Sequence, residues 1–281
     1  MVTSKLVNYG SNILKNGNVK THRIDSEILL SHVLKISREK LLITENSVSP
    51  KKTLKFKSLI SRRLKSEPIA YILQTKEFRS KDFIIKPTSL IPRPETELLI
   101  DPIVKFFKNK NLFFLDVGVG TGCIISSILM ELKNSSGVGL DISAVAISNT
   151  LINLRKQKLE NRARLFNKSI NNFNNYMFDL VISNPPYINR RDIKRLSDDI
   201  KKFEPRIALD GGNDGLDVIK KVIYKSKYIL KNNGLLALEI GNGQYISVNN
   251  LLKRNNFRQI LALKDYNNNI RCIFSTLQKN V

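Results

Sequence analysis

The sequence is poor in the residues that most often build metal sites and disulfide frameworks. Its 281 residues include two histidines, two cysteines and no tryptophan. Cys123 and Cys272 are too few for a disulfide framework or a zinc site. No apolar run approaches the roughly 18–20 residues of a membrane span, and the N-terminal stretch lacks the apolar core of a signal peptide. We therefore expect a cytoplasmic protein with no metal ligands and no membrane anchor.

Acidic residues are also scarce. Lysine and arginine number 47 against 24 aspartates and glutamates, which gives a formal net charge of +23. Such a surface attracts polyanions. However, the basic residues are scattered along the chain apart from clusters such as Lys51–Lys57 and Arg190–Arg195, and the abundance of Lys, Asn and Ile is typical of AT-rich coding. The charge is compatible with a nucleic-acid or ribosomal role but does not require one.

The N-terminal part of the chain has a helical pattern. In DSEILLSHVLKI the apolar residues recur at helical spacing behind Asp25, which we expect to be the helix cap; Ser37 is expected to cap a second helix. The alternation from EFRSKDFIIKP to about Arg93 predicts a β-hairpin. We therefore expect a helical domain over residues 1–74, a hairpin linker over 75–93 and a second domain over 94–281.

From Pro94 onward, strands and helices alternate, which indicates a parallel α/β sheet. The last two strands are expected to form an antiparallel pair, which brings the sheet to seven strands. The predicted strands are NLFFLDV, GVGLD, RARLF, FDLVISN, GLLALEI, FRQILALKD and IRCIFST, with helices over 121–132, 143–157, 215–231 and 246–253.

A glycine-rich turn, DVGVGTG, falls where the first strand of this sheet meets its helix. Glycines there let the backbone turn tightly and approach a ligand closely. Asp141 ends the second strand, about twenty residues further on, where a carboxylate can accept hydrogen bonds from both hydroxyls of a ribose. Together the two features predict a nucleoside site, for NAD or for S-adenosylmethionine. Taken singly, the turn could be a plain strand–helix connection and Asp141 a helix cap.

Two consecutive prolines follow the fourth strand, in Asn184, Pro185, Pro186 and Tyr187. Proline has no N–H, so this turn presents carbonyl oxygens that no local amide claims. An –NH2 group can donate one hydrogen to the Asn184 side-chain oxygen and one to the Pro185 carbonyl. We interpret the turn as an acceptor clamp that orients a planar nitrogen toward an incoming methyl group, with Tyr187 as an aromatic wall. The work of such a clamp is orientation rather than base catalysis; a simple proline-rich turn is the alternative.

These motifs resemble those of the protein-(glutamine-N5) methyltransferases that modify class-1 peptide chain release factors, the PrmC or HemK family. The resemblance extends over essentially the whole chain. It is carried by DSEILLSHVLKISREKLL, EPIAYIL, SLIPRPETELL, LDVGVGTGCI, SNPPYI, FEPRIALDGGNDGL and LEIGNGQ.

The resemblance implies a fold and an activity. The fold is a seven-stranded Rossmann-like class I S-adenosylmethionine-dependent methyltransferase domain, preceded by a small helical domain that grips the release factor and by a β-hairpin. The activity is methylation of the glutamine side-chain nitrogen in the Gly-Gly-Gln tripeptide of the release factor, with S-adenosylmethionine as donor. Separately from the resemblance, we expect the enzyme to be a monomer.

The resemblance also implies roles for single residues. S-adenosylmethionine would be wrapped by the turn at Gly118, Val119, Gly120, Thr121 and Gly122, with Asp141 on its ribose. Asn184 would touch both cofactor and substrate, and Asn184–Tyr187 would bind the substrate glutamine. The segment Arg93–Glu97 would pack beside the methionine end of the cofactor, although Pro94 with Glu95 and Glu97 is also a good helix start.

Two positions depart from the family pattern. Gln74 stands where the family usually has glycine after Tyr-Ile-Leu. After the third strand the family often carries Asp and an aromatic residue near the adenine, and this chain has Lys168 and Ser169 there. We expect Ser169 or the backbone to make the adenine contacts instead.

Two other functions fit the same motifs. An exocyclic –NH2 of adenine in nucleic acid, or a glutamine of a ribosomal protein, would suit the clamp equally well. Flipping a base into the site calls for a dedicated recognition region, and the sequence carries no known nucleic-acid motif. A non-catalytic cofactor-binding or RNA-binding module is the second alternative, but such a protein would have no use for an acceptor clamp.

Overall fold

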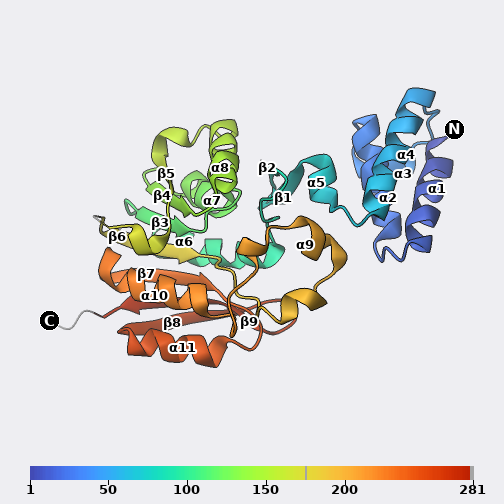
Figure 1. The fold of residues 1–281 in the computed structure, drawn as a ribbon. Helices are drawn as coiled ribbons and strands as arrows, with labels where there is room; N and C mark the ends of the chain where they lie inside the picture. Colours follow the sequence, from blue (N-terminus) through green and yellow to red (C-terminus); the bar gives the residue numbers. More distant parts are fainter. Residues whose placement is uncertain (175, 279–281) are drawn as a thin grey trace. The chain divides into compact units, whose positions relative to one another are not determined.

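The computed structural model describes residues 1–174 and 176–278, and Asn175 and residues 279–281 of the predicted 94–281 domain lie outside the described residues. The chain forms two compact units (Figure 1). One contains Met1–Thr75 with Ser197–Phe203, and the other contains Lys76–Leu196 with the chain from Glu204 onward. Within the described ranges, no helix is both long and apolar enough to cross a bilayer.

The first unit is built from short helices around an apolar core that includes Leu6, Leu30 and Phe56. A Cβ atom added to Gly10 would lie 2.5 Å from Ser26 Oγ and 2.7 Å from Phe56. A larger residue at position 10 would therefore force the first helix away from its neighbours. The helices of this unit are α1 (Thr3–Asn16), α2 (His22–Leu34), α3 (Arg38–Ile43), α4 (Pro50–Leu64), α5 (Ile69–Leu73) and α9 (Asp198–Phe203).

The predicted cap at Asp25 is wrong, because α2 begins one turn earlier, at His22, with Thr21 as the cap residue. Asp25 lies in the first turn, where its carboxylate accepts a hydrogen bond from Thr21 Oγ1 (2.8 Å) and pairs with Arg63 at 2.7 Å. The apolar periodicity does not extend into this polar first turn and so did not reveal it. The predicted cap of α3 is confirmed, since Ser37 Oγ accepts from the Lys40 N–H at 3.2 Å.

The hairpin between the helices and the large sheet consists of β1 (Thr75–Phe78) and β2 (Lys81–Ile84). Its two turn residues, Arg79 and Ser80, have φ of 49° and 56°, as a tight turn between twisted strands requires. Gln74 also has a left-handed φ, 57°, at the end of α5. Glycine meets this conformation at the least cost, which gives a physical reason for the glycine of the family pattern.

Two buried asparagines on α8 (Ala144–Lys156) hold this hairpin to the large unit. Asn153 Oδ1 accepts from the Ile84 N–H (2.7 Å), and its Nδ2 donates to the carbonyls of Ile84 and Thr121, both at 2.9 Å. Asn149 bonds the Lys86 N–H and the Ile84 carbonyl in the same way. The two side chains thus act as a neighbouring strand would, a role that no sequence pattern indicates.

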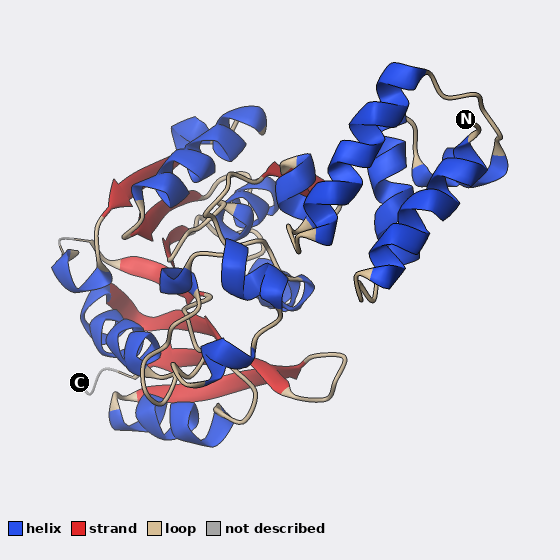
Figure 2. Cartoon of the chain, turned by 45° about the vertical axis from the view of Figure 1, so that its right-hand side comes forward, coloured by secondary structure: helices blue, strands red, loops and turns tan. Residues whose placement is uncertain are grey.

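The large unit contains the predicted seven-stranded sheet, in the order β5-β4-β3-β6-β7-β9-β8. Figure 2 draws the strands in red. Every strand pair is parallel except those of β9, which runs antiparallel to β7 and β8 as expected. The strands are β3 (Phe113–Val117), β4 (Ser136–Asp141), β5 (Ala163–Asn167), β6 (Phe178–Ser183), β7 (Leu230–Glu239), β8 (Phe257–Lys264) and β9 (Ile270–Leu277).

Helices flank this sheet in two groups. One comprises α6 (Ile100–Phe106), α7 (Cys123–Glu131) and α8, and the other α10 (Asp217–Ile229) and α11 (Tyr245–Arg254). The chain runs outward from β3 through β4 to β5, then returns to β6 on the other side of β3. Open α/β sheets bind ligands in the crevice that such a reversal leaves at the carboxyl ends of the strands.

Asn153→Leu tests the asparagine anchor. The substitution keeps the approximate shape but removes the partners of the Ile84 N–H and of the Thr121 carbonyl, while the Ile84 carbonyl keeps its bond from Asn149. We therefore expect the free energy of unfolding to fall by about 2–4 kcal/mol. Urea denaturation would measure this loss. The control is Asn250→Leu at an exposed site of α11, which should change stability by less than about 0.5 kcal/mol. Equal losses in the two variants would contradict the anchor.

Candidate active site

A cavity of about 540 Å³ opens at the carboxyl edge of the sheet, beside the point of strand reversal. This volume is within the range of small-molecule sites. Its wall is formed by the turn after β3, the end of β4, the loops after β5 and β6, and two further loops. The wall residues relevant here are Thr88, Ser89, Leu90, Gly118, Gly120, Asp141, Lys168, Ser169, Asn184, Pro186, Arg190, Arg206, Asp210 and Lys221.

The glycine-rich turn reaches this cavity with only part of its length. Gly118 and Gly120 lie on the wall with φ of 76° and 58°, a left-handed conformation that favours glycine. Val119 is buried and packs toward Gly139 of β4. Thr121 and Gly122 are also buried, and a Cβ on Gly122 would lie 2.8 Å from Thr150. Of the five predicted residues, two therefore face the cavity and three shape the turn.

Asp141 braces this turn from the end of β4. Its Oδ2 accepts from the Gly120 N–H at 3.0 Å and its Oδ1 from the Ser143 N–H at 2.9 Å. Burial raises the pKa of the Asp141 carboxyl, and these backbone hydrogen bonds oppose the rise. The cap of α8 is Ser143 rather than Asp141. Asp141 stands on the cavity wall, where a ribose could meet its oxygens.

The clamp residues follow β6 directly. Asn184 Nδ2 donates to Thr96 Oγ1 at 3.0 Å, and the Thr96 hydroxyl donates to Glu239 Oε2 at 2.6 Å. The Tyr187 hydroxyl donates to Glu239 Oε1 at 3.0 Å. Asn184 and Pro186 line the cavity, whereas Pro185 is buried and Tyr187 is turned toward β7.

The backbone after the clamp is held by a second loop. The Ile188 N–H donates to the Leu209 carbonyl at 3.1 Å, and the Gly211 N–H donates back to Ile188. A Cβ on Gly215 would lie 2.4 Å from the Tyr187 carbonyl oxygen. Only a residue without a side chain lets the two backbone segments approach this closely, which explains why glycine occurs in FEPRIALDGGNDGL.

Glu239 and Gln244 were not predicted as site residues. Glu239 ends β7 with no exposed surface, and burial raises the pKa of its carboxyl while hydrogen bonds from Thr96 and Tyr187 lower it. Gln244 Nε2 donates to the Tyr187 carbonyl at 2.9 Å and to the Gly215 carbonyl at 3.2 Å. Both lie in the segment LEIGNGQ, whose resemblance to the family was the one available signal.

The segment Arg93–Glu97 lies outside the cavity wall and supports the site through its contacts with neighbouring segments. It begins the 3-10 helix η1 (Pro94–Leu99), with Glu95 and Glu97 in the first turn as predicted. Arg93 pairs with Glu204, and Glu97 accepts a hydrogen bond from the Arg79 N–H at 2.9 Å. Thr88–Leu90, just before this segment, form the cavity wall instead.

Ser169 lies on the cavity wall beside Lys168. Its hydroxyl accepts from the Asn171 N–H at 3.3 Å and caps the short helix η3 (Ile170–Asn172). The structure thus brings Ser169 together with Gly118, Gly120, Asp141 and Asn184 around one cavity.

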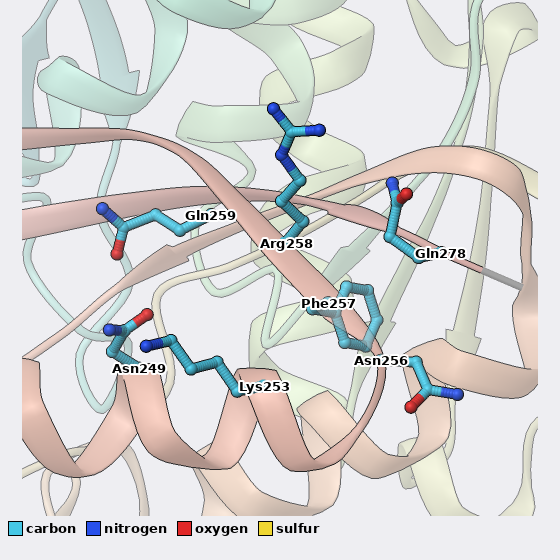
Figure 3. Close-up of a pocket in the computed structure, with 7 residues that line it drawn as sticks. All are labelled: Asn249, Lys253, Asn256, Phe257, Arg258, Gln259 and Gln278. Carbon is cyan, nitrogen blue, oxygen red and sulfur yellow. The ribbon is translucent and has the colours of Figure 1, made fainter.

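A second, open hollow of about 570 Å³ lies between α11, β8 and the end of β9 (Figure 3). Its walls are largely polar side chains, among them Lys253, Arg258 and Gln259. It shares no residue with the cavity at the sheet edge. The predicted site residues that line a cavity all line the one at the sheet edge, namely Gly118, Gly120, Asp141, Ser169, Asn184 and Pro186.

Solved structures with a similar fold define the class of protein. A methyltransferase from Pyrococcus furiosus matches with a TM-score of 0.54 at 15% identity over 78% of this chain and 98% of the other. A ribosomal protein L11 methylase from Lactobacillus delbrueckii subsp. bulgaricus matches with a TM-score of 0.51 at 16% identity, over 67% and 81%. The fold is that of the class I S-adenosylmethionine-dependent methyltransferases.

Sequence relatives define the family. Residues 5–73 match the PrmC N-terminal domain, and residues 94–200 match the methyltransferase small domain. The release factor glutamine methyltransferase of Clostridium botulinum is 36% identical over 94% of this chain and 95% of its own length. That of Clostridium acetobutylicum is 38% identical over 90% and 91%. The chain therefore belongs to the release factor glutamine methyltransferase family.

Asp141→Asn tests the brace beneath the glycine turn. One oxygen becomes an –NH2 that must face the N–H of Gly120 or of Ser143, so the turn loses a charge-assisted hydrogen bond. We expect S-adenosylmethionine to bind about 10–100-fold more weakly by calorimetry. Asp101→Asn at an exposed carboxylate of α6 should bind normally. Unchanged affinity in Asp141→Asn would contradict the brace.

The buried carboxyl of Asp116 predicts how the stability of the protein depends on pH. It has no exposed surface, its Oδ2 accepts from the Ile125 N–H at 3.1 Å, and burial raises its pKa to about 8. The unfolded chain releases this proton near pH 4, so the native state holds the extra proton between about pH 4 and pH 8. In that window the contribution of Asp116 to stability falls as pH rises.

Asp116→Asn removes this titration. The unfolding free energy of the variant minus that of the wild type should therefore be larger at pH 8 than at pH 5, as measured with urea. Asp101→Asn should show no such trend. A difference that stays constant between the two pH values would show that Asp116 titrates normally.

Proposed function

We propose that this protein transfers a methyl group from S-adenosylmethionine to the side-chain nitrogen of the glutamine in the Gly-Gly-Gln tripeptide of class-1 peptide chain release factors, in support of translation termination. The observation that carries the proposal is the engaged amide nitrogen of Asn184. Because Nδ2 already donates to Thr96, the oxygen Oδ1 is the part of the amide left to accept from a substrate.

The cavity fits the proposed methyl donor. Gly118 and Gly120 leave room for close approach to the backbone, Asp141 offers carboxylate oxygens to a ribose, and Ser169 lies on the same wall. These residues would hold the nucleoside part of S-adenosylmethionine, with Asn184 at the junction with the substrate. S-adenosylmethionine supplies a methyl group on a positively charged sulfur, which is an electrophile.

The clamp acts by orientation. A glutamine amide would give one N–H to Asn184 Oδ1 and the other to the Pro185 carbonyl, which directs the face of its nitrogen toward the methyl group. Fixing two reactants in this geometry replaces a bimolecular encounter with an intramolecular step. Tyr187, fixed through its hydroxyl to Glu239, would border the substrate side.

Each of the three parts of the chain has a proposed role. Residues 1–74 would recognise the release factor, residues 75–93 would link the parts, and residues 94–281 would carry out the transfer. The match of residues 5–73 to the PrmC N-terminal domain supports this division. We further propose that the protein acts in the cytoplasm, which agrees with its two buried free thiols, Cys123 and Cys272, and that it acts as a monomer.

Labelled methyl transfer tests the proposal. Class-1 release factor, its variant with alanine in place of the tripeptide glutamine, total RNA and total DNA would be offered separately with labelled S-adenosylmethionine. We expect label on the intact factor and none on the alanine variant. Label on nucleic acid alone would overturn the proposal and favour an adenine methyltransferase.

Asn184→Ala tests the clamp in the same assay. Loss of one positioned acceptor should lower kcat by about 10²–10³-fold while the protein remains folded and binds the cofactor. Asn250→Ala, at an exposed site, should keep the wild-type rate. A wild-type rate in Asn184→Ala would contradict the clamp.

A further inference from the structure

We propose that Thr96 and Glu239 are positioning residues that fix which end of the Asn184 amide meets the substrate, and that they thereby make the site select an –NH2 group over a carboxylate. The inference deepens the proposed function and rests on it. The three residues form a chain of hydrogen bonds that leads from the end of β7 through η1 to the clamp.

The chain of bonds is buried and short. Thr96 is 2% exposed and Glu239 is fully buried. Thr96 Oγ1 lies 2.6 Å from Glu239 Oε2 and 3.0 Å from Asn184 Nδ2. The other oxygen of Glu239 accepts from the Tyr187 hydroxyl at 3.0 Å. Each oxygen of this carboxylate therefore has a hydroxyl donor.

The direction of each bond follows from the number of hydrogens available. With Glu239 in the ionised form that its two hydroxyl donors favour, its carboxylate only accepts, and the Thr96 hydroxyl has one hydrogen to give. The hydrogen of Thr96 goes to Glu239, so toward Asn184 its oxygen can only accept. The end of the Asn184 amide that faces Thr96 must therefore be the –NH2. The reversed amide would place two oxygens together with no hydrogen between them, which costs about the full penalty of an unmade buried hydrogen bond.

This constraint has a consequence for the substrate. An amide nitrogen of asparagine and its oxygen have nearly the same shape, so the protein must select between them by hydrogen bonding. With Nδ2 held by Thr96, the clamp presents acceptors and matches the two donor hydrogens of a glutamine side chain. A glutamate carboxylate would meet acceptors only. Sites built to pair with a polar group reject an analogue that leaves buried groups unpaired.

Thr96→Val tests the inference. Valine keeps the shape of threonine but cannot accept a hydrogen bond, so the Asn184 amide loses the bond that selects its orientation. Thr96→Ser keeps the hydroxyl and serves as the conservative variant. Ser127→Ala is the matched control, because it removes another buried hydroxyl, whose bond to the Cys123 carbonyl (2.7 Å) stays within α7.

Two quantities would be measured for each variant. The first is kcat and KM for labelled methyl transfer to release factor. The second is the preference for glutamine over glutamate. It is the ratio of two dissociation constants, one for release factor with glutamate in the tripeptide and one for release factor with glutamine there, both measured with S-adenosylhomocysteine bound in place of the methyl donor. Thermal unfolding and calorimetry with S-adenosylmethionine would report folding and cofactor affinity. Should Thr96→Val not fold, Thr96→Ala removes the same acceptor and carries the same expectation.

We expect Thr96→Val to lower kcat by about 10–100-fold and to reduce the preference for glutamine over glutamate by a similar factor. Its affinity for S-adenosylmethionine should stay within about 3-fold of wild type, a shift of less than about 1 kcal/mol. Thr96→Ser should restore most of the rate and of the preference. Ser127→Ala should lower the melting temperature without changing either quantity.

A Thr96→Val enzyme with the wild-type rate and the wild-type preference would overturn the inference. So would a loss of rate with the preference intact, because that result describes a structural defect alone. Failure of the proposed function is separate: in that case the wild-type enzyme itself would not methylate release factor.

Discussion

The carboxylate of Glu239 is buried at the end of β7, where an unsatisfied charge would be costly. Hydroxyl groups from Thr96 and Tyr187 satisfy it. Thr96 lies 143 residues before Glu239 in the sequence, and Tyr187 lies 52 residues before it. Pairing this one anion therefore draws η1 and the loop after β6 to the same strand end. The turn at Asn184–Tyr187 is thus organised around Glu239, and Asn184 at its start lies on the wall of the cavity at the sheet edge.

The register of the sheet explains how the remaining groups meet. Val117 pairs with Leu140 and with Ser183, and Ser183 pairs with Leu238. The next residue on each strand or turn is Gly118, Asp141, Asn184 or Glu239, and these four residues form one row along the carboxyl edge. Parallel pairing thus converts four separate places in the sequence into one site. The short apolar strands need only the correct order and register to assemble it.

Local patterns were sufficient to predict the strands and to place the glycine turn and the Asn184–Tyr187 turn at the carboxyl edge of the sheet. Each strand and helix can be predicted from the periodicity of a few consecutive residues, and the alternation of strands with helices then indicates a parallel sheet. The support for Asn184 comes from Thr96, 88 residues earlier, and a bond of that range leaves no periodic signal. The buried Asn149 and Asn153 were missed for a related reason. A polar residue on a helix is normally expected to face solvent, and nothing near it in the sequence indicates otherwise. The wrong cap at Asp25 shows the limit at short range, since capping depends on backbone geometry that composition only suggests.

The environment of Asn184 agrees with the proposed mechanism, which uses no general base. Both histidines, His22 and His32, lie in the helical unit. At the clamp, the two oxygens of Glu239 are already occupied, and burial beside that carboxylate raises the pKa of Tyr187 and keeps it protonated. Asp210 on the cavity wall pairs with Arg190 at 3.0 Å. Glu239, Tyr187 and Asp210 are thus committed to holding other groups of the protein. A planar amide nitrogen is a weak nucleophile, so its reaction depends on alignment with an electrophilic methyl group, and in the proposed function alignment is the contribution that such a fixed arrangement makes.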